Sequence, residues 1–145
     1  MITSCRKTTV LVADDDPALV ALVTVLLERE GYSVATAHNG QEALDQATAS
    51  PADLVLLDLR MPVMDGWACY SSLKQHPETK TIPVIVMSAE AGGATRGAEL
   101  GVDYFLSKPF EVNDLLSSVK RFAGRASRDP GSASFPETLP EAVNT

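Results

Sequence analysis

The sequence predicts an α/β protein in which helices cover both faces of a parallel, five-stranded sheet. Two observations support this fold class. Short apolar runs alternate with helical patterns five times along the 145 residues, and no internal repeat is present. The runs at 8–13, 52–58 and 82–89 are almost continuously apolar, which is typical of strands that are buried on both faces. Strands and helices in regular alternation are also typical of parallel strands joined by crossover helices.

The first predicted strand, 8–13, is followed by a helix with clear start and stop signals. Asp16 is a favourable N-cap residue, and Pro17 suits the first helical position because its fixed φ matches that of a helix. The helical pattern continues to Glu30, and Gly31 ends it. Apolar residues at helical spacing predict the side that faces the core: Leu19, Leu22, Val23 and Leu26.

The later elements have similar signals. Asn39-Gly40 begins the second helix, Asp65-Gly66 begins the third, and Pro77 follows the end of the third. Strands are predicted at 32–37, 52–58, 82–89 and 103–108, and helices at 39–49, at 65–76, weakly after 89, and at about 111–122. Right-handed crossovers leave few topologies, and the one predicted is a flavodoxin-like, doubly wound (βα)5 fold with strand order 2-1-3-4-5.

The predicted domain spans residues 1–123. From Gly124 the composition changes to a stretch with three prolines and no apolar periodicity, which predicts a disordered tail over 124–145. A tail of this length is too short to form a second domain, so no output domain is expected.

Composition narrows the classes of partner. The formal net charge is −7 and the pI is about 4.7, so the chain has no general attraction to nucleic acid or to anionic lipid. Cys5 and Cys69 match no metal-ligand spacing and predict free thiols in a reducing cytosol. The longest uncharged stretch, 17–27, is too short to cross a membrane, and we expect a cytoplasmic protein.

Polar residues end four of the five predicted strands. They are Asp14 and Asp15, Asp58, Ser88 and Lys108. In the predicted strand order these strands are neighbours, so their carboxyl ends share one crevice, which is where such sheets bind ligands. Three carboxylates that lie close together need a counter-charge, and oxygen ligands of this kind suit Mg²⁺. With a lysine and a hydroxyl group added, the set suits a phosphoryl group beside a nucleophilic carboxylate.

The chain resembles a response-regulator receiver domain of two-component signalling, of the single-domain type, over about residues 7–123. The resemblance rests on Asp14-Asp15 and on the segments LLDLRMPVMDG, VMSA and SKPF, which occur in order at suitable strand ends. It implies that Asp58 is the phospho-acceptor. It also implies that Mg²⁺ is bound by Asp15, by Asp58 and by the backbone carbonyl of Arg60, with Asp14 acting through water.

The same resemblance assigns roles to the later motifs. Ser88 and Lys108 would contact the phosphoryl oxygens, and the peptide bond before Pro109 would be cis. Phe105 matches the aromatic residue that changes rotamer as Ser88 moves toward the phosphoryl group. The surface that would change lies over the weak helix after residue 89, the strand at 103–108 and the last helix.

The implied partners are proteins. A phosphohistidine of a sensor histidine kinase or of a histidine phosphotransfer domain would donate the phosphoryl group, and a downstream protein target would read the change. The chain would be a monomer or a weak dimer with no role in binding nucleic acid or a membrane. It would assist its own phosphorylation and dephosphorylation without being a turnover enzyme.

Three other functions share parts of this pattern. A phosphohydrolase of the haloacid-dehalogenase type also uses an Asp nucleophile, but it needs a second Asp two residues later, where this chain has Arg60. A flavodoxin needs a phosphate loop rich in glycine and hydroxyl groups after the first strand, where the aspartates at 14–16 would repel phosphate. A pseudo-receiver binds partners without phosphorylation, which the complete acidic and lysine set disfavours.

Several features are particular to this chain. Phe105 lacks the hydroxyl group of a tyrosine, and the glycine-rich segment 90–101 predicts a short, mobile helix. Arg60 and Glu90 each follow a site residue by two positions, and we expect this pair to face across the site mouth and to tune the lifetime of the phosphoryl group. Apolar residues outside the expected core stripe of the first helix, namely Val20, Ala21 and Val25, form either a docking face for the phosphodonor or simply an apolar helix surface.

Overall fold

The computed structural model describes residues 7–89 and 92–127. The strands are β1 (Thr9–Ala13), β2 (Ser33–Ala37), β3 (Leu54–Asp58), β4 (Val84–Ser88) and β5 (Tyr104–Ser107). The helices are α1 (Pro17–Arg29), α2 (Gly40–Ala49), α3 (Gly66–Gln75), α4 (Gly93–Leu100) and α5 (Val112–Ser127). All neighbouring strands are parallel and their order is β2-β1-β3-β4-β5, which confirms the predicted flavodoxin-like fold.

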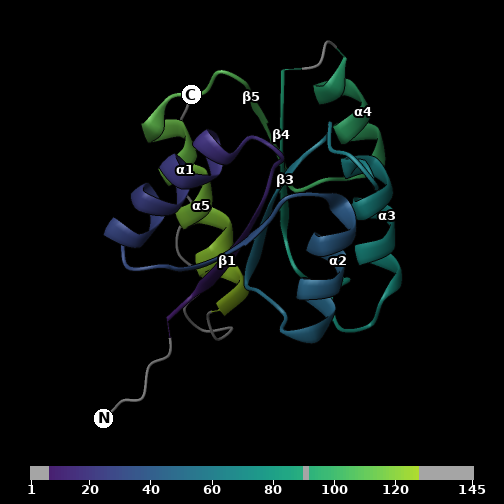
Figure 1. Cartoon of the computed structure of the whole chain (residues 1–145), viewed down its shortest axis with the longest axis horizontal. Coiled ribbons are helices and arrows are strands. Elements are labelled where there is room, and N and C mark those ends of the chain that lie inside the picture. The colour runs from purple at the N-terminus through teal and green to yellow at the C-terminus, as the bar shows by residue number, and fades with distance from the viewer. Residues whose placement is uncertain (1–6, 90–91, 128–145) are drawn as a thin grey trace.

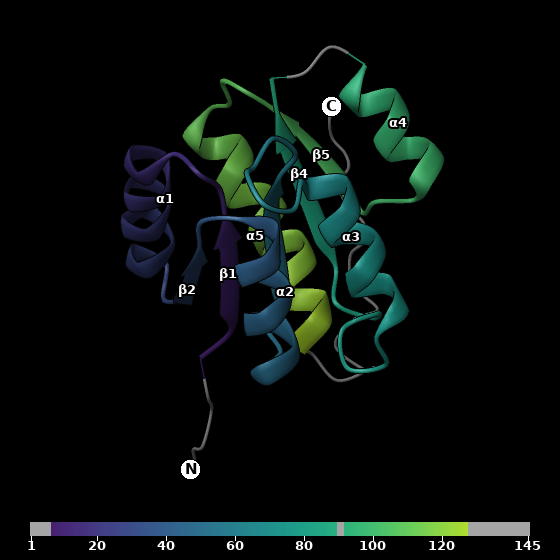
Figure 2. The same cartoon turned by 45° about the vertical axis from the view of Figure 1, so that its right-hand side comes forward.

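The helices form a layer on each side of the sheet. α1 and α5 cover one face, and α2, α3 and α4 cover the other (Figures 1 and 2). Successive residues of the central strands alternate between the two layers, because side chains along a strand point to opposite faces. In β3, for example, Val55 and Leu57 join the core beneath α2 and α3, whereas Leu54 and Leu56 join the core beneath α1 and α5. These strands are buried on both sides, as their continuous apolar runs predict.

Side-chain caps fix where three helices begin. The carboxylate of Asp16 accepts hydrogen bonds from the backbone amides of Ala18 and Leu19 at the start of α1. Asp65 accepts one from Ala68 at the start of α3, over 2.9 Å. Asn39 caps α2 in the same way. Each cap satisfies backbone amides that have no partner inside the helix, and each confirms a start signal in the sequence.

The predicted core stripe of α1 is wrong in part. The residues of this helix that are buried against the sheet are Val20, Val23 and Leu27, whereas Leu22 is 53% exposed. Leu19 and Leu26 are only half-buried, and Val20, predicted to lie outside the core, lies inside it. The helix is apolar on almost every side, so several stripes have helical spacing, and only packing against the sheet decides between them.

The last helix is longer than predicted. α5 continues to Ser127, beyond the expected end at Phe122, since Ala and Arg in this stretch favour a helix. Residues 128–145, which make up most of the predicted tail, lie outside the described residues.

Glu90 and Cys5 also lie outside the described residues. The predicted pairing of Arg60 with Glu90 therefore stays a prediction. No helix in the described part of the chain combines the length and apolar character needed to cross a membrane.

Candidate functional site

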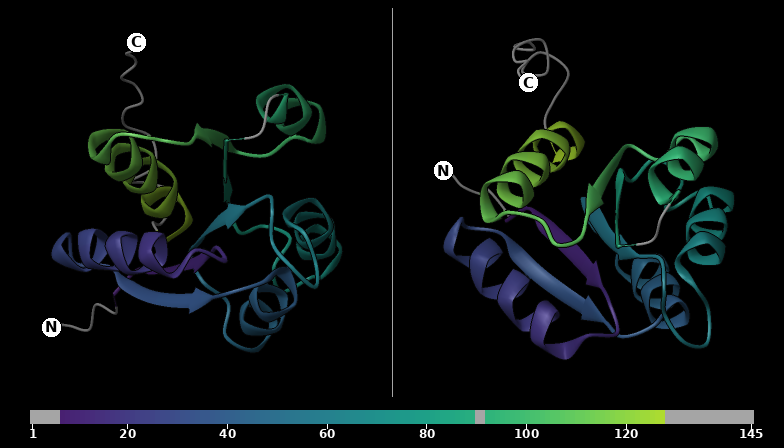
Figure 3. Two further views of the ribbon diagram at one scale, coloured as in Figure 1. Left: turned by 45° about the horizontal axis from the view of Figure 1, so that its top comes forward. Right: turned by 90° about the horizontal axis from the view of Figure 1, so that it is seen from above.

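The register of the sheet brings the predicted site residues to one edge. Ala13 at the end of β1 pairs with Leu57, and Asp58 at the end of β3 pairs with Met87. Asp14 therefore follows β1 next to the position where Asp58 ends β3. Figure 3 shows the strands and the two helix layers from two further directions.

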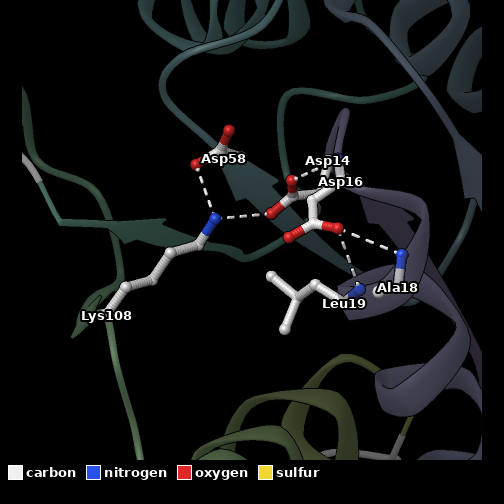
Figure 4. Close-up of polar contacts among 6 residues, drawn as sticks. All are labelled: Asp14, Asp16, Ala18, Leu19, Asp58 and Lys108. Atoms are coloured by element: carbon white, nitrogen blue, oxygen red, sulfur yellow. Dashed lines mark hydrogen bonds and ion pairs between the residues drawn. The ribbon is translucent and has the colours of Figure 1, made fainter.

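Lys108 joins two of the aspartates. Its Nζ donates hydrogen bonds to Oδ2 of Asp14 over 2.7 Å and to Oδ1 of Asp58 over 3.1 Å, and the three side chains point toward one another (Figure 4). Asp14 is 1% exposed and Asp58 is 5% exposed. The other oxygen of Asp14, Oδ1, accepts a hydrogen bond from the backbone amide of Asp16. The loop after β5 thus supplies the cation that compensates carboxylates at the ends of β1 and β3.

Burial and charge act on these groups in opposite directions. Burial raises the pKa of Asp58, and the neighbouring charge of Asp14 raises it further, although Lys108 partly offsets both effects. Burial alone would lower the pKa of Lys108, but its hydrogen bonds to Asp14 and Asp58 outweigh that effect and raise the pKa. Ionised Asp58 is therefore held at a cost that a further cation would relieve.

The acidic cluster has the composition of a divalent-cation site. One carboxylate oxygen from each of Asp14, Asp15 and Asp58 lies within 4.8 Å of the others, and Asp15 is exposed to solvent. Three carboxylates and one ammonium group leave two negative charges uncompensated. Hard oxygen ligands in this number fit Mg²⁺, which binds through a few carboxylates and keeps several waters.

The loop after β3 depends on close backbone contacts. The amide of Gly66 donates to the carbonyl of Leu59 over 2.9 Å, and a Cβ at Gly66 would lie only 2.2 Å from the carbonyl oxygen of Asp58. Only glycine fits there. Val63, at the tip of the loop, has a φ of 69° and is 82% exposed, and the amide of Met64 donates to the carbonyl of Pro62 across it. This arrangement is a γ-turn, a conformation that is strained for a branched residue.

The remaining predicted residues lie along β4 and β5. Ser88 ends β4 and is 2% exposed, and its carbonyl accepts a hydrogen bond from the amide of Lys108 over 2.9 Å. The bond between Lys108 and Pro109 is cis, which agrees with the prediction. Phe105 is half-buried against the core beneath α4, and a Cβ at Gly93 would lie 2.9 Å from Cζ of its ring.

A pocket beside the acidic cluster contains residues that no sequence motif singles out. It has a volume of about 600 Å³ and opens to solvent next to Asp15. Its lining residues are Asp15, Leu59, Arg60, Met61, Pro62, Asp65, Trp67 and Arg96. The guanidinium carbon of Arg96 lies 4.7 Å from the centroid of the Trp67 ring, so a cation–π contact joins α4 to α3. The two helices are separated in sequence by β4, and only the tertiary structure brings these two side chains together.

Comparisons with known proteins agree with this geometry. The family model described as the response regulator receiver domain matches residues 10–120. The transcriptional regulatory protein CpxR of Escherichia coli K12 is 39% identical over 119 residues, which is 81% of this chain and 50% of CpxR. The DNA-binding dual master transcriptional regulator RpaA of a Synechocystis strain is 35% identical over 132 residues, covering 90% of this chain and 55% of RpaA. The chain thus spans about half the length of these curated relatives.

Solved structures give the same fold. The chemotaxis protein CheY4 of Vibrio cholerae superposes with a TM-score of 0.74 and 29% identity, covering 81% of this chain and 99% of that structure. The receiver domain of the sensor histidine kinase PA1611 of Pseudomonas aeruginosa gives a TM-score of 0.75 and 26% identity, over 82% of this chain and 99% of that domain. That domain is described with a magnesium ion coordinated in its active-site cleft.

Proposed function

Because the chain belongs to the response regulator receiver domain family, we propose that Asp58 accepts a phosphoryl group from a phosphohistidine of a histidine kinase or of a phosphotransfer domain. The observation that carries the proposal is the bridge that Lys108 makes between Asp14 and Asp58 at the carboxyl edge of the sheet. It leaves the second oxygen of Asp58, Oδ2, available as the nucleophile while Oδ1 is held in position.

The chain's own residues have distinct tasks in the transfer. A carboxylate oxygen of Asp58 attacks phosphorus in line with the departing imidazole nitrogen, and the Lys108 ammonium stabilises negative charge on the phosphoryl oxygens. Mg²⁺, when bound by Asp15, Asp58 and the backbone carbonyl of Arg60, with Asp14 acting through water, supplies further positive charge to these oxygens. Because Asp14 and Asp58 are buried, the effective dielectric constant around them is low, and the charges at the site interact more strongly than they would in water.

Phosphorylation then changes the surface over α4, β5 and α5. The hydroxyl of Ser88 moves toward the new phosphoryl oxygens, and Phe105 changes its position as Ser88 moves. Because Phe105 contacts α4 at Gly93, a shift of the ring is transmitted to the start of that helix. The resulting two-state surface controls the binding of a downstream protein.

The exposed side of α1 is the docking face for the phosphodonor. Leu22 and Val25 are 53% and 52% exposed, and Ala21 is exposed beside them. Exposed apolar residues on a helix suit the apolar side of a partner helix. The net charge of −7 argues against nucleic acid as a partner of this domain. The domain acts in the cytoplasm as a monomer or a weak dimer.

The receiver family is a signalling module, and this chain acts as a switch that returns to its resting state when the acyl phosphate hydrolyses. Incubation with a small phosphodonor and Mg²⁺, followed by intact mass measurement, tests the proposal. We expect the wild-type chain to gain the mass of one phosphoryl group and Asp58→Asn to gain none. An Asp58→Asn chain that gains this mass at the wild-type rate would refute the assignment.

A further inference from the structure

The two ends of α4 are held by different kinds of contact, and the carboxyl end is tied to α3. The hydroxyl of Tyr70 donates a hydrogen bond to the carbonyl of Leu100, the last residue of α4, over 3.3 Å. Tyr70 is itself confined, because it is only 6% exposed and the ammonium group of Lys74 lies 5.5 Å from the centroid of its ring. The same ammonium group donates a hydrogen bond to the carbonyl of Ile82 over 3.0 Å. The hydrogen bond to Leu100 therefore comes from a side chain that has little freedom to move.

The turn after α4 holds this end further. Gly101 has a φ of 83°, and its amide donates to the carbonyl of Gly97 over 2.9 Å. The amide of Val102 donates to the same carbonyl over 3.0 Å, so the end of the helix has its backbone partners. Asp103 then joins β4, since its carboxylate accepts a hydrogen bond from the amide of Val84 over 2.9 Å. The carboxyl end of α4 is thus connected to the sheet through a short chain of hydrogen bonds.

The amino end of α4 is held only by side-chain packing in the described residues. Gly92 caps the helix with a φ of 81° and offers no side-chain hydrogen bond. Gly93 packs on two side chains: a Cβ there would lie 2.9 Å from Cζ of Phe105 and 3.5 Å from Cδ1 of Leu59. Leu59 directly follows Asp58, and Phe105 is the ring that we propose to move on phosphorylation. The free end of the helix therefore lies on the two side chains closest to the proposed switch.

Given the proposed phosphorylation of Asp58, we infer that α4 pivots about its carboxyl end, with Tyr70 as the positioning residue that keeps Leu100 in place. A shift of the whole helix would break the hydrogen bond from Tyr70 and the turn that follows α4. A pivot repacks only the amino end, where Gly93 follows the ring of Phe105. The surface that differs between the two states is then the amino-terminal half of α4, and a partner that distinguishes the states binds there.

Distances between spin labels test the pivot in the full-length chain with Mg²⁺ and beryllofluoride, an analogue of the aspartyl phosphate. Labels on Ala94→Cys or Ala98→Cys, two exposed positions on one side of α4, are each paired with a label on Asp45→Cys, an exposed position of α2. Cys5→Ser removes one native thiol, and Cys69 is buried. The two positions on α4 lie about 9 Å and about 3 Å along the helix from its last residue. We therefore expect beryllofluoride to change the distance from position 94 about three times as much as that from position 98.

Two conservative variants separate the role of the Tyr70 hydroxyl from that of its ring. Tyr70→Phe keeps the ring and removes the donor to Leu100. We expect this variant to increase the change at position 98 until it approaches that at position 94, because the carboxyl end is no longer held. Tyr104→Phe removes the hydroxyl of an exposed tyrosine on β5 and should keep the wild-type ratio, which makes it the matched control.

The outcomes separate the inference from the function on which it rests. Equal changes at positions 94 and 98 of the wild-type chain, or no change at either position in a chain that binds beryllofluoride, would overturn the pivot. A wild-type ratio in Tyr70→Phe would overturn the role of Tyr70. A wild-type chain whose Tm shows no binding of beryllofluoride in the presence of Mg²⁺ would instead refute the phosphoryl site at Asp58.

Discussion

The ammonium group of Lys108 lies 3.1 Å from Oδ1 of Asp58, although 50 residues separate the two in sequence. Asp58 ends the central strand β3 and Lys108 follows the edge strand β5. The contact therefore forms only when the strands pair in the order β2-β1-β3-β4-β5. It therefore connects the fold directly to the proposed chemistry.

Removal of the Lys108 ammonium should affect both stability and phosphorylation. Lys108→Ala leaves two buried carboxylates without their cation, and we expect the free energy of unfolding to fall by about 1–3 kcal/mol. The rate of phosphorylation should fall roughly a hundredfold, since one charge donor to the phosphoryl oxygens is lost. Lys120→Ala, at an exposed position of α5, is the control for both measurements. A wild-type phosphorylation rate in Lys108→Ala would contradict the assigned role.

The ionisation of Asp58 should make the metal-free protein less stable at neutral pH. The pKa of Asp58 is raised in the folded state, so its ionised form costs free energy above the folded pKa and nothing below the ordinary carboxyl pKa. Asp58→Asn should therefore raise the free energy of unfolding by on the order of 1 kcal/mol at pH 7. The advantage should disappear as the pH falls through the raised pKa toward the ordinary range. Denaturant titrations of both proteins at several pH values measure this difference, and an advantage that grows in acid would contradict the prediction.

Magnesium should reverse that order of stability. A cation bound by Asp15 and Asp58 stabilises the folded state of the wild type through mass action, and Asp58→Asn lacks one of its ligands. In thermal melts, increasing Mg²⁺ should raise the Tm of the wild type well above its metal-free value. The Tm of Asp58→Asn should stay nearly constant. Equal shifts in the two proteins would place the cation elsewhere.

Gly93 should be needed for the observed position of Phe105. Alanine normally stabilises a helix relative to glycine by about 1 kcal/mol, but a Cβ at Gly93 would meet the Phe105 ring at 2.9 Å. We expect Gly93→Ala to destabilise the protein, and we expect the added change Phe105→Leu to recover part of the loss. Thr95→Ala, on the exposed side of α4, should stabilise slightly and serves as the control. A gain in stability from Gly93→Ala would show that the ring is not confined there.

Helix α4 should exchange its amide protons faster than α5. It has eight residues, contains Gly97 in its interior, and is capped by Gly92, which offers no side-chain hydrogen bond. Short helices with these features are only marginally stable without tertiary support. Hydrogen exchange that is as slow in α4 as in α5 would contradict the predicted mobility.

The sequence predicts the fold well because its signals are local. Continuous apolar strands, the caps at Asp16 and Asp65, and alternation of strands with helices together leave few topologies. The strand-end rule also places Asp14, Asp58 and Lys108 together, since the carboxyl ends of parallel strands share one edge. These three residues need no tertiary information beyond the strand order.

Features that depend on packing are harder to predict from the sequence. Leu22 and Val20 have equivalent spacing in an apolar helix, and only the orientation of α1 against the sheet buries Val20 and exposes Leu22. The contact between Trp67 and Arg96 joins two helices whose relative position is not encoded in either segment. The sequence likewise does not predict the γ-turn at Val63, because a branched residue rarely adopts a positive φ.

The most direct test of the central claim is to locate the phosphoryl group on the phosphorylated wild-type chain. Borohydride reduces an acyl phosphate of aspartate to homoserine, and mass spectrometry of peptides then identifies the modified position. We predict homoserine at position 58 and unmodified aspartate at positions 14, 15 and 65 of the same sample. A phosphorylated chain with homoserine at another position, or with none, would contradict the account.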